Sequence, residues 1–142
     1  MFVVTMISNP RKAMARKILV IDDDKSVRDI IVYILKKFDV VAFEDSKILK
    51  SLDKCKPDLI ILDNWLTEWA SDATGEQLSR ELKTNPATRH IPVIIISAVS
   101  NVKEIASAGL ADAYLHKPFD RKSLVGAVEN LLSAMEFDPA VN

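Results

Sequence analysis

Polar side chains stand at the carboxyl ends of four short apolar runs in this chain. They are Asp22, Asp23 and Asp24 after KILVI, Asp63 at the end of DLIILD, Ser97 at the end of VIIIS, and Lys117 at the end of AYLHK. Carboxylates that gather in one place repel one another, which raises their pKa values unless a cation is present. Oxygen ligands without histidine or thiolate suit a hard cation, above all Mg²⁺.

A carboxylate can also act as a nucleophile and form an aspartyl phosphate. Asp63 is the best candidate, because it ends the third of five apolar runs and is expected at the centre of a sheet. The Lys117 ammonium and the Ser97 hydroxyl would hold the other oxygens of the phosphoryl group. Asp24 or Ser26 is instead expected to cap the following helix.

The elements that must position these side chains alternate along the chain. Apolar, β-branched runs typical of buried strands occupy 17–21, 40–43, 58–63, 93–97 and 113–117. Between them, apolar residues recur with helical spacing. The predicted helices span 27–38, 46–55, 75–84, 101–108 and 123–135, and Gly109 is expected as a C-cap.

Five strand–helix units in succession imply a parallel sheet with helices on both faces. Right-handed crossovers make such a sheet doubly wound. We therefore predict an α/β fold of the flavodoxin-like type, with five strands in the order 2-1-3-4-5. Ligands of this fold bind outside the carboxyl ends of the strands, so the polar side chains above are expected to converge in one pocket.

Composition excludes several classes of protein. The 142 residues suit one domain, and 19 basic against 20 acidic residues argue against a nucleic-acid-binding domain. One cysteine and two histidines cannot form a zinc site or an internal disulfide, so a reducing, cytoplasmic setting fits. The three glycines form neither a GxGxxG motif nor a P-loop. No apolar run is long enough to span a membrane.

The segments ILVIDDD, LIILDNW, VIIISA and AYLHKPF, in that order, resemble the receiver domain of two-component response regulators over about residues 17–135. The resemblance implies that Asp63 accepts a phosphoryl group from a sensor histidine kinase or a histidine phosphotransfer protein. It also implies Mg²⁺ as the cofactor. The expected metal ligands are Asp23 directly, Asp22 through water, Asp63, and the backbone carbonyl of Trp65.

Further roles follow from the same resemblance. Ser97 and Lys117 would contact the phosphoryl group, Tyr114 matches the aromatic switch residue, and the Lys117–Pro118 bond is a candidate for the cis form. The expected function is a stand-alone signalling switch, not a conventional enzyme. It would signal to a separate protein partner through the face made by 101–108, 113–117 and 123–135, or form a homodimer through that face.

The segment after Asp63 departs from the family pattern. Leu66 and Thr67 stand where methionine and proline are common, and the loop to Gly75 is about four residues longer than usual. Trp65 and Val99 are hypothesised to restrict the attacking water and so lengthen the phosphorylated lifetime. The alternative for the loop is that its tryptophans, Trp65 and Trp69, anchor a partner.

Residues 1–16 are interpreted as an N-terminal extension, 17–136 as the domain, and 137–142 as a C-terminal tail. The extension is either a solvated leader, a docking segment or a strand added to the sheet edge. Two other functions are kept open. One is an interaction domain that does not depend on phosphorylation. The other is a haloacid-dehalogenase-like phosphatase, in which Asp22 would be the nucleophile.

Overall fold

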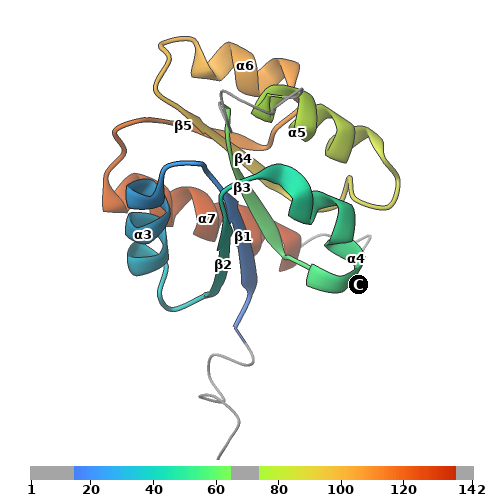
Figure 1. The fold of residues 1–142 in the computed structure, drawn as a ribbon, viewed down its shortest axis with the longest axis horizontal. Coiled ribbons are helices and arrows are strands. Elements are labelled where there is room, and N and C mark those ends of the chain that lie inside the picture. The colour runs from blue at the N-terminus through green and yellow to red at the C-terminus, as the bar shows by residue number, and fades with distance from the viewer. Residues whose placement is uncertain (1–14, 65–73, 137–142) are drawn as a thin grey trace, which may run out of the picture.

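The computed structural model describes residues 15–64 and 74–136, and Figure 1 shows their arrangement. Five strands form one sheet, in which every neighbouring pair is parallel and the order is β2-β1-β3-β4-β5. This confirms the predicted topology. The strands are β1 (Lys17–Ile21), β2 (Asp39–Phe43), β3 (Leu59–Asp63), β4 (Val93–Ser97) and β5 (Ala113–His116).

Helices cover both faces of the sheet (Figure 1). They are α3 (Lys25–Ile34), η1 (Ser46–Ser51), α4 (Leu52–Cys55), α5 (Gly75–Thr84), α6 (Val102–Ala108) and α7 (Arg121–Glu136). One core lies between the sheet and α3 with α7, and the other lies between the sheet and α4, α5 and α6. No helix in the described ranges is long and apolar enough to cross a bilayer.

The strand sequences explain the two cores. Each residue of β3 and β4 is buried, because successive side chains point alternately into the core on one face and the core on the other. Ile61 and Ile94 face α3 and α7, whereas Ile60 and Ile95 face the opposite helices. A run of large apolar residues without alternation is therefore required at these central strands.

Some helix boundaries differ from those predicted. The helical spacing extends to Phe38, but α3 ends at Ile34, because Leu35 leaves the helical region with φ −97° and ψ 26°. Phe38 still packs on the core, now from a turn, so its place in the periodic pattern reflects burial and not helix. The single helix expected over 46–55 is a 3₁₀ helix, η1, followed by the short α4.

Gly109 caps α6 as predicted, but it does not take the left-handed conformation that such glycines often supply. Its φ is −83°, and the positive φ of 60° falls on Leu110. Glycine is needed at 109 for space: a Cβ there would lie 2.8 Å from the carbonyl oxygen of Glu76 in α5. The close approach of α5 and α6 explains this glycine.

Candidate functional site

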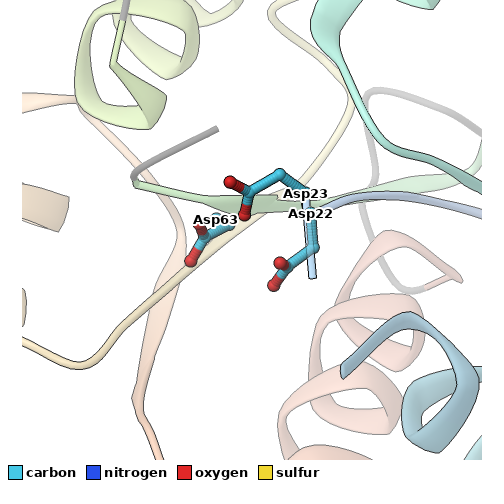
Figure 2. Close-up of side chains that lie close together, drawn as sticks. All are labelled: Asp22, Asp23 and Asp63. Atoms are coloured by element: carbon cyan, nitrogen blue, oxygen red, sulfur yellow. The ribbon is translucent and has the colours of Figure 1, made fainter. Parts of the chain in front are cut away.

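The polar residues at the strand ends meet at one edge of the sheet, as predicted. Asp22 and Asp23 follow β1, and Asp63 is the last residue of β3. Their carboxylates gather in one cluster (Figure 2), and one oxygen of each lies within 4.8 Å of the others. Asp22 and Asp63 are buried, with 0% and 4% of their surface exposed, whereas Asp23 is exposed.

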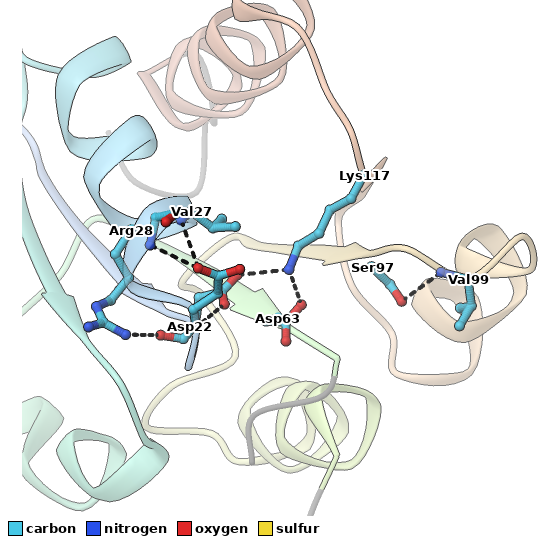
Figure 3. Close-up of polar contacts among 9 residues, drawn as sticks. Asp22, Val27, Arg28, Asp63, Ser97, Val99 and Lys117 are labelled. Carbon is cyan, nitrogen blue, oxygen red and sulfur yellow. Dashed lines mark hydrogen bonds and ion pairs between the residues drawn. The ribbon is translucent and has the colours of Figure 1, made fainter. Parts of the chain in front are cut away.

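Lys117, which follows β5, supplies a positive charge to this cluster. Its Nζ lies 3.0 Å from Asp22 Oδ2 and 2.8 Å from Asp63 Oδ1, so that one ammonium bridges two carboxylates (Figure 3). The Lys117–Pro118 peptide bond is cis, as the resemblance predicted. The cluster of three carboxylates and one lysine keeps an excess of negative charge.

The burial of these groups changes their acidity. Burial raises the pKa of Asp63 to about 6, although the hydrogen bond from Lys117 opposes the shift, and the negative charge of Asp22 adds to it. Burial also raises the pKa of Asp22. For Lys117, burial lowers the pKa, but the contacts with Asp63 and Asp22 outweigh it and the net shift is upward. Such shifts are expected where carboxylates are gathered for binding or reaction.

Backbone contacts fix the turn that carries Asp22. Asp22 Oδ1 accepts a hydrogen bond from the Asp24 N–H at 2.9 Å. Arg28 Nη1 donates to the Asp22 carbonyl oxygen at 2.7 Å, as Figure 3 shows. Asp24 caps α3 by accepting from the N–H groups of Ser26 and Val27. The sequence predicted Asp24 as a cap, but it did not point to Arg28, which reaches back from the second turn of α3.

Ser97 and Tyr114 lie where the sequence placed them, on β4 and β5. Ser97 is buried, and in the described part of the chain its hydroxyl accepts from the Val99 N–H at 3.3 Å. Tyr114 pairs in register with Ile95 and is 43% exposed on the α6 side of the sheet. Trp65 and Trp69 lie outside the described residues, so the predictions for the Trp65 carbonyl and the tryptophan loop remain predictions.

The donor set suits the predicted cation. The three carboxylates offer oxygen atoms alone, which are the ligands that Mg²⁺ prefers. Two of them are buried and only partly neutralised by Lys117, so a divalent cation would relieve their repulsion. The exposed Asp23 leaves one side of the cluster open to solvent, where water and phosphate oxygens can complete the coordination of such an ion.

Comparison with known proteins agrees with this geometry. The sequence model of the family described as "Response regulator receiver domain" matches residues 18–129. The chain is similar to the phosphate regulon transcriptional regulatory protein PhoB of Escherichia coli, with 35% identity over 84% of this chain and 52% of that protein. It is also similar to the DNA-binding response regulator MtrA of Mycolicibacterium smegmatis, with 31% identity over 89% of this chain and 55% of that protein.

Solved structures show the same likeness. The crystal structure of the receiver domain of NtrX from Brucella abortus is 30% identical in sequence, with a TM-score of 0.71. That alignment covers 82% of this chain and 98% of the solved one. The chain thus spans about half the length of the curated relatives it matches but nearly all of this solved domain.

Proposed function

Because the chain belongs to the response regulator receiver domain family, we propose that it is a phosphorylation-dependent switch whose phosphoacceptor is Asp63. The bridge that Lys117 makes to Asp22 and Asp63 carries this proposal. An ammonium fixed at this point stabilises the charge that develops on a phosphoryl oxygen, provided that it is already in place before the reaction. The raised pKa of Asp63 further marks it as a carboxylate held for chemistry.

The reaction begins with a phosphohistidine on a sensor histidine kinase or a histidine phosphotransfer protein. A carboxylate oxygen of Asp63 attacks the phosphorus, the O–P bond forms, and the N–P bond breaks. The electron pair of that bond stays on the imidazole nitrogen, which takes up a proton. Lys117 then moves its hydrogen bond from the Asp63 carboxylate to an oxygen of the transferred group.

Asp22, Asp23 and Asp63, with the backbone carbonyl of Trp65, would hold Mg²⁺. When bound, the ion neutralises charge on the phosphoryl oxygens and orients them for in-line transfer. Asp22 keeps its position through the Asp24 N–H and the Arg28 guanidinium, and Asp23 presents its carboxylate from the exposed side. The fixed carboxylate of Asp22 and the accessible carboxylate of Asp23 would together define where the ion binds.

The output proposed for the phosphorylated form is a change at the face formed by α6, β5 and α7. The Ser97 hydroxyl would turn from the Val99 N–H toward the phosphoryl group, and Tyr114 would follow, which shifts an existing equilibrium between two conformations. Tyr114 of β5 is 43% exposed, which leaves a large aromatic side chain on this face for contact with a partner protein or a second copy of the chain.

The competing assignment of Asp22 as nucleophile has weaker support. Asp22 Oδ1 accepts from the Asp24 N–H, and Asp22 Oδ2 accepts from Lys117, so both of its oxygens are engaged. We therefore propose a phosphoacceptor of the cytoplasm and not a turnover phosphatase. Nucleic-acid binding is not proposed for this domain, because 19 basic against 20 acidic residues leave no excess of positive charge.

The test is the intact mass of the protein after incubation with Mg²⁺ and acetyl phosphate as a small phosphodonor. The wild type is expected to gain the mass of one phosphoryl group, and Asp63→Ala to gain none. EDTA should abolish the gain, since the carboxylates would then lack their cation. Equal labelling of wild type and Asp63→Ala would contradict the proposal.

A further inference from the structure

We infer that Asn64, the residue after the proposed phosphoacceptor, is a positioning residue that joins the end of β3 to the start of α5 and thereby holds Asp63 in place. The inference rests on the proposed function, because it concerns the rate of phosphoryl transfer to Asp63. Asn64 is 5% exposed, which is unusual for a polar side chain at the end of a strand. The hydrogen bonds of its backbone and side chain account for this burial.

Within the residues that the structure describes, Asn64 makes three hydrogen bonds, to β4 and α5. Its N–H donates to the Ile96 carbonyl oxygen at 3.0 Å, which extends the β3–β4 pairing beyond Asp63. Its carbonyl oxygen accepts from the Gly75 N–H at 2.9 Å, and its side-chain Oδ1 accepts from the Glu76 N–H at 3.0 Å. The last two satisfy N–H groups in the first turn of α5, which have no partner within the helix.

Gly75 brings α5 into direct contact with the backbone of Asp63. A Cβ at position 75 would lie 2.5 Å from the Asp63 carbonyl oxygen and 2.8 Å from the Asn64 Cα, so only glycine fits there. The peptide group between Asp63 and Asn64 is thus held by β4 on one side and by the start of α5 on the other. This fixes the point from which the Asp63 side chain leaves the sheet.

The same contacts join the two ends of the segment 65–73. The Asn64 carbonyl oxygen and the Gly75 nitrogen are 2.9 Å apart, so the end of β3 and the start of α5 are hydrogen-bonded to each other on either side of this segment. Lengthening a closed loop costs little free energy once its ends are fixed. The longer segment of this chain is therefore compatible with an unchanged position of Asp63.

The structure offers a matched control within the same helix. Thr74 caps α5 through its Oγ1, which accepts from the Gln77 N–H at 3.2 Å, but none of its hydrogen bonds in the described part of the chain is to β3. Asn64→Ala and Thr74→Ala each remove one side-chain acceptor from the first turn of α5. Only Asn64→Ala removes a hydrogen bond between α5 and the residue next to Asp63, while the backbone bond from Gly75 to residue 64 remains.

The experiment measures the rate constant of phosphorylation by acetyl phosphate at saturating Mg²⁺, and the hydrogen exchange of the Glu76 amide. We expect Asn64→Ala to be phosphorylated about tenfold more slowly, since a small displacement of a reacting group is costly, and to lose protection at Glu76. Thr74→Ala should keep both the phosphorylation rate and the protection of the Glu76 amide. A rate for Asn64→Ala within about twofold of the wild type, or an equal loss in both variants, would overturn the inference.

Asn64→Ser offers a neutral side-chain oxygen that can accept from the Glu76 N–H without adding charge beside Asp63. It is expected to recover the Glu76 protection and most of the rate, which a loss of bulk stability alone would not explain. Recovered protection without recovered rate would contradict the positioning role. If the wild type itself takes up no phosphoryl group, the proposed function fails together with this inference; if the wild type reacts and Asn64→Ala matches it, this inference alone fails.

Discussion

At the scale of single residues, the balance of charge at the strand ends governs the site. Asp22 and Asp63 are buried beside Asp23, and Lys117 is the cation that contacts two of the three carboxylates. Without a metal ion, the folded protein must hold more negative than positive charge in one place, which costs free energy. The site is thus expected to lower the stability of the apo protein, and its two central groups can be tested separately.

Asp63→Asn is expected to stabilise the metal-free protein at neutral pH. Burial raises the Asp63 pKa from its ordinary 3.8 to about 6, so between these values the folded state holds a proton that the unfolded state has released. The free energy of unfolding therefore falls as pH rises through this window. Asparagine carries no charge, so Asp63→Asn should remove this pH dependence. At pH values above the window, it should raise the free energy of unfolding by on the order of 2 kcal/mol relative to the wild type.

Urea unfolding of both proteins in EDTA across this pH range checks the prediction. The two curves of stability against pH should separate as pH rises and stay apart above a pH of about 6. Parallel curves, or a less stable Asp63→Asn at neutral pH, would contradict it.

Lys117→Met should have the opposite effect. It leaves Asp22 and Asp63 buried without their shared cation, and removing one partner of a buried ion pair costs about 3 kcal/mol. Saturating Mg²⁺ is expected to restore much of this loss, because the ion replaces the missing positive charge. Thermal unfolding with and without Mg²⁺ measures both effects. A variant as stable as the wild type in EDTA would show that the bridge contributes little.

The sequence identified the residues whose position follows from strand ends alone. Asp22, Asp63 and Ser97 were placed correctly because the carboxyl ends of parallel strands share one edge of the sheet. Arg28 and Asn64 were missed, because their roles depend on contacts with backbone groups of other elements. The signal that could have shown Asn64 is its amide side chain directly after a fully apolar strand, where a buried polar group needs a partner.

At the scale of elements, the close packing of α6 against α5 determines where glycine is required. Gly109 lets the end of α6 approach α5, where Ser79 Oγ donates to the Gly109 carbonyl oxygen at 2.8 Å and Arg80 Nη1 donates to that of Ala108 at 2.7 Å. By contrast, nothing lies within 4 Å of a Cβ built at Gly126 in α7. Position 109 therefore has no room for a side chain, whereas position 126 does.

Replacement of each glycine by alanine should change stability in opposite directions. Gly109→Ala forces a Cβ against the Glu76 carbonyl at 2.8 Å and is expected to lower the free energy of unfolding by about 2 kcal/mol. Gly126→Ala fills open space in a helix interior and should raise it by about 0.5–1 kcal/mol. Urea denaturation of the pair measures both. Destabilisation by Gly126→Ala, or none by Gly109→Ala, would show that the packing of these helices is not as described.

The order and type of the elements could be predicted because each strand is a run of apolar residues without polar interruption. The ends of helices were predicted less well. Phe38 and Leu35 continue the helical spacing beyond α3, but both bury their side chains from outside the helix. Spacing reports which side chains are buried, whereas the end of a helix depends on where the backbone must turn toward the next strand.

At the scale of the whole molecule, the sheet connects the carboxylate cluster to both hydrophobic cores. β1 and β3 are central strands and contribute to the core on each face, and both end at the carboxylates. An ion that binds the folded cluster but not the unfolded chain must therefore stabilise the entire domain. The binding of the proposed cofactor can therefore be measured through the stability of the whole domain, without phosphorylation.

Mg²⁺ is expected to raise the Tm of the wild type in a concentration-dependent way, and EDTA to reverse the change. Asp23→Ala should weaken this rise in Tm with little other effect on the fold, because Asp23 is exposed. Asp24→Ala is the control, since Asp24 caps α3 and is not a proposed ligand. A Mg²⁺ response that Asp23→Ala leaves unchanged, or that Asp24→Ala abolishes, would place the ion elsewhere.

Asp63 is the proposed site of phosphorylation in this domain. The most direct measurement is to phosphorylate the wild type with Mg²⁺ and acetyl phosphate, reduce the acyl phosphate with borohydride, and locate the modified residue by peptide mass spectrometry. Modification is expected at Asp63, and none is expected at Asp22 or Asp23. Modification at Asp22, whose two oxygens both accept hydrogen bonds in this structure, would rule out Asp63 as the phosphoacceptor and would favour a phosphatase-like nucleophile instead.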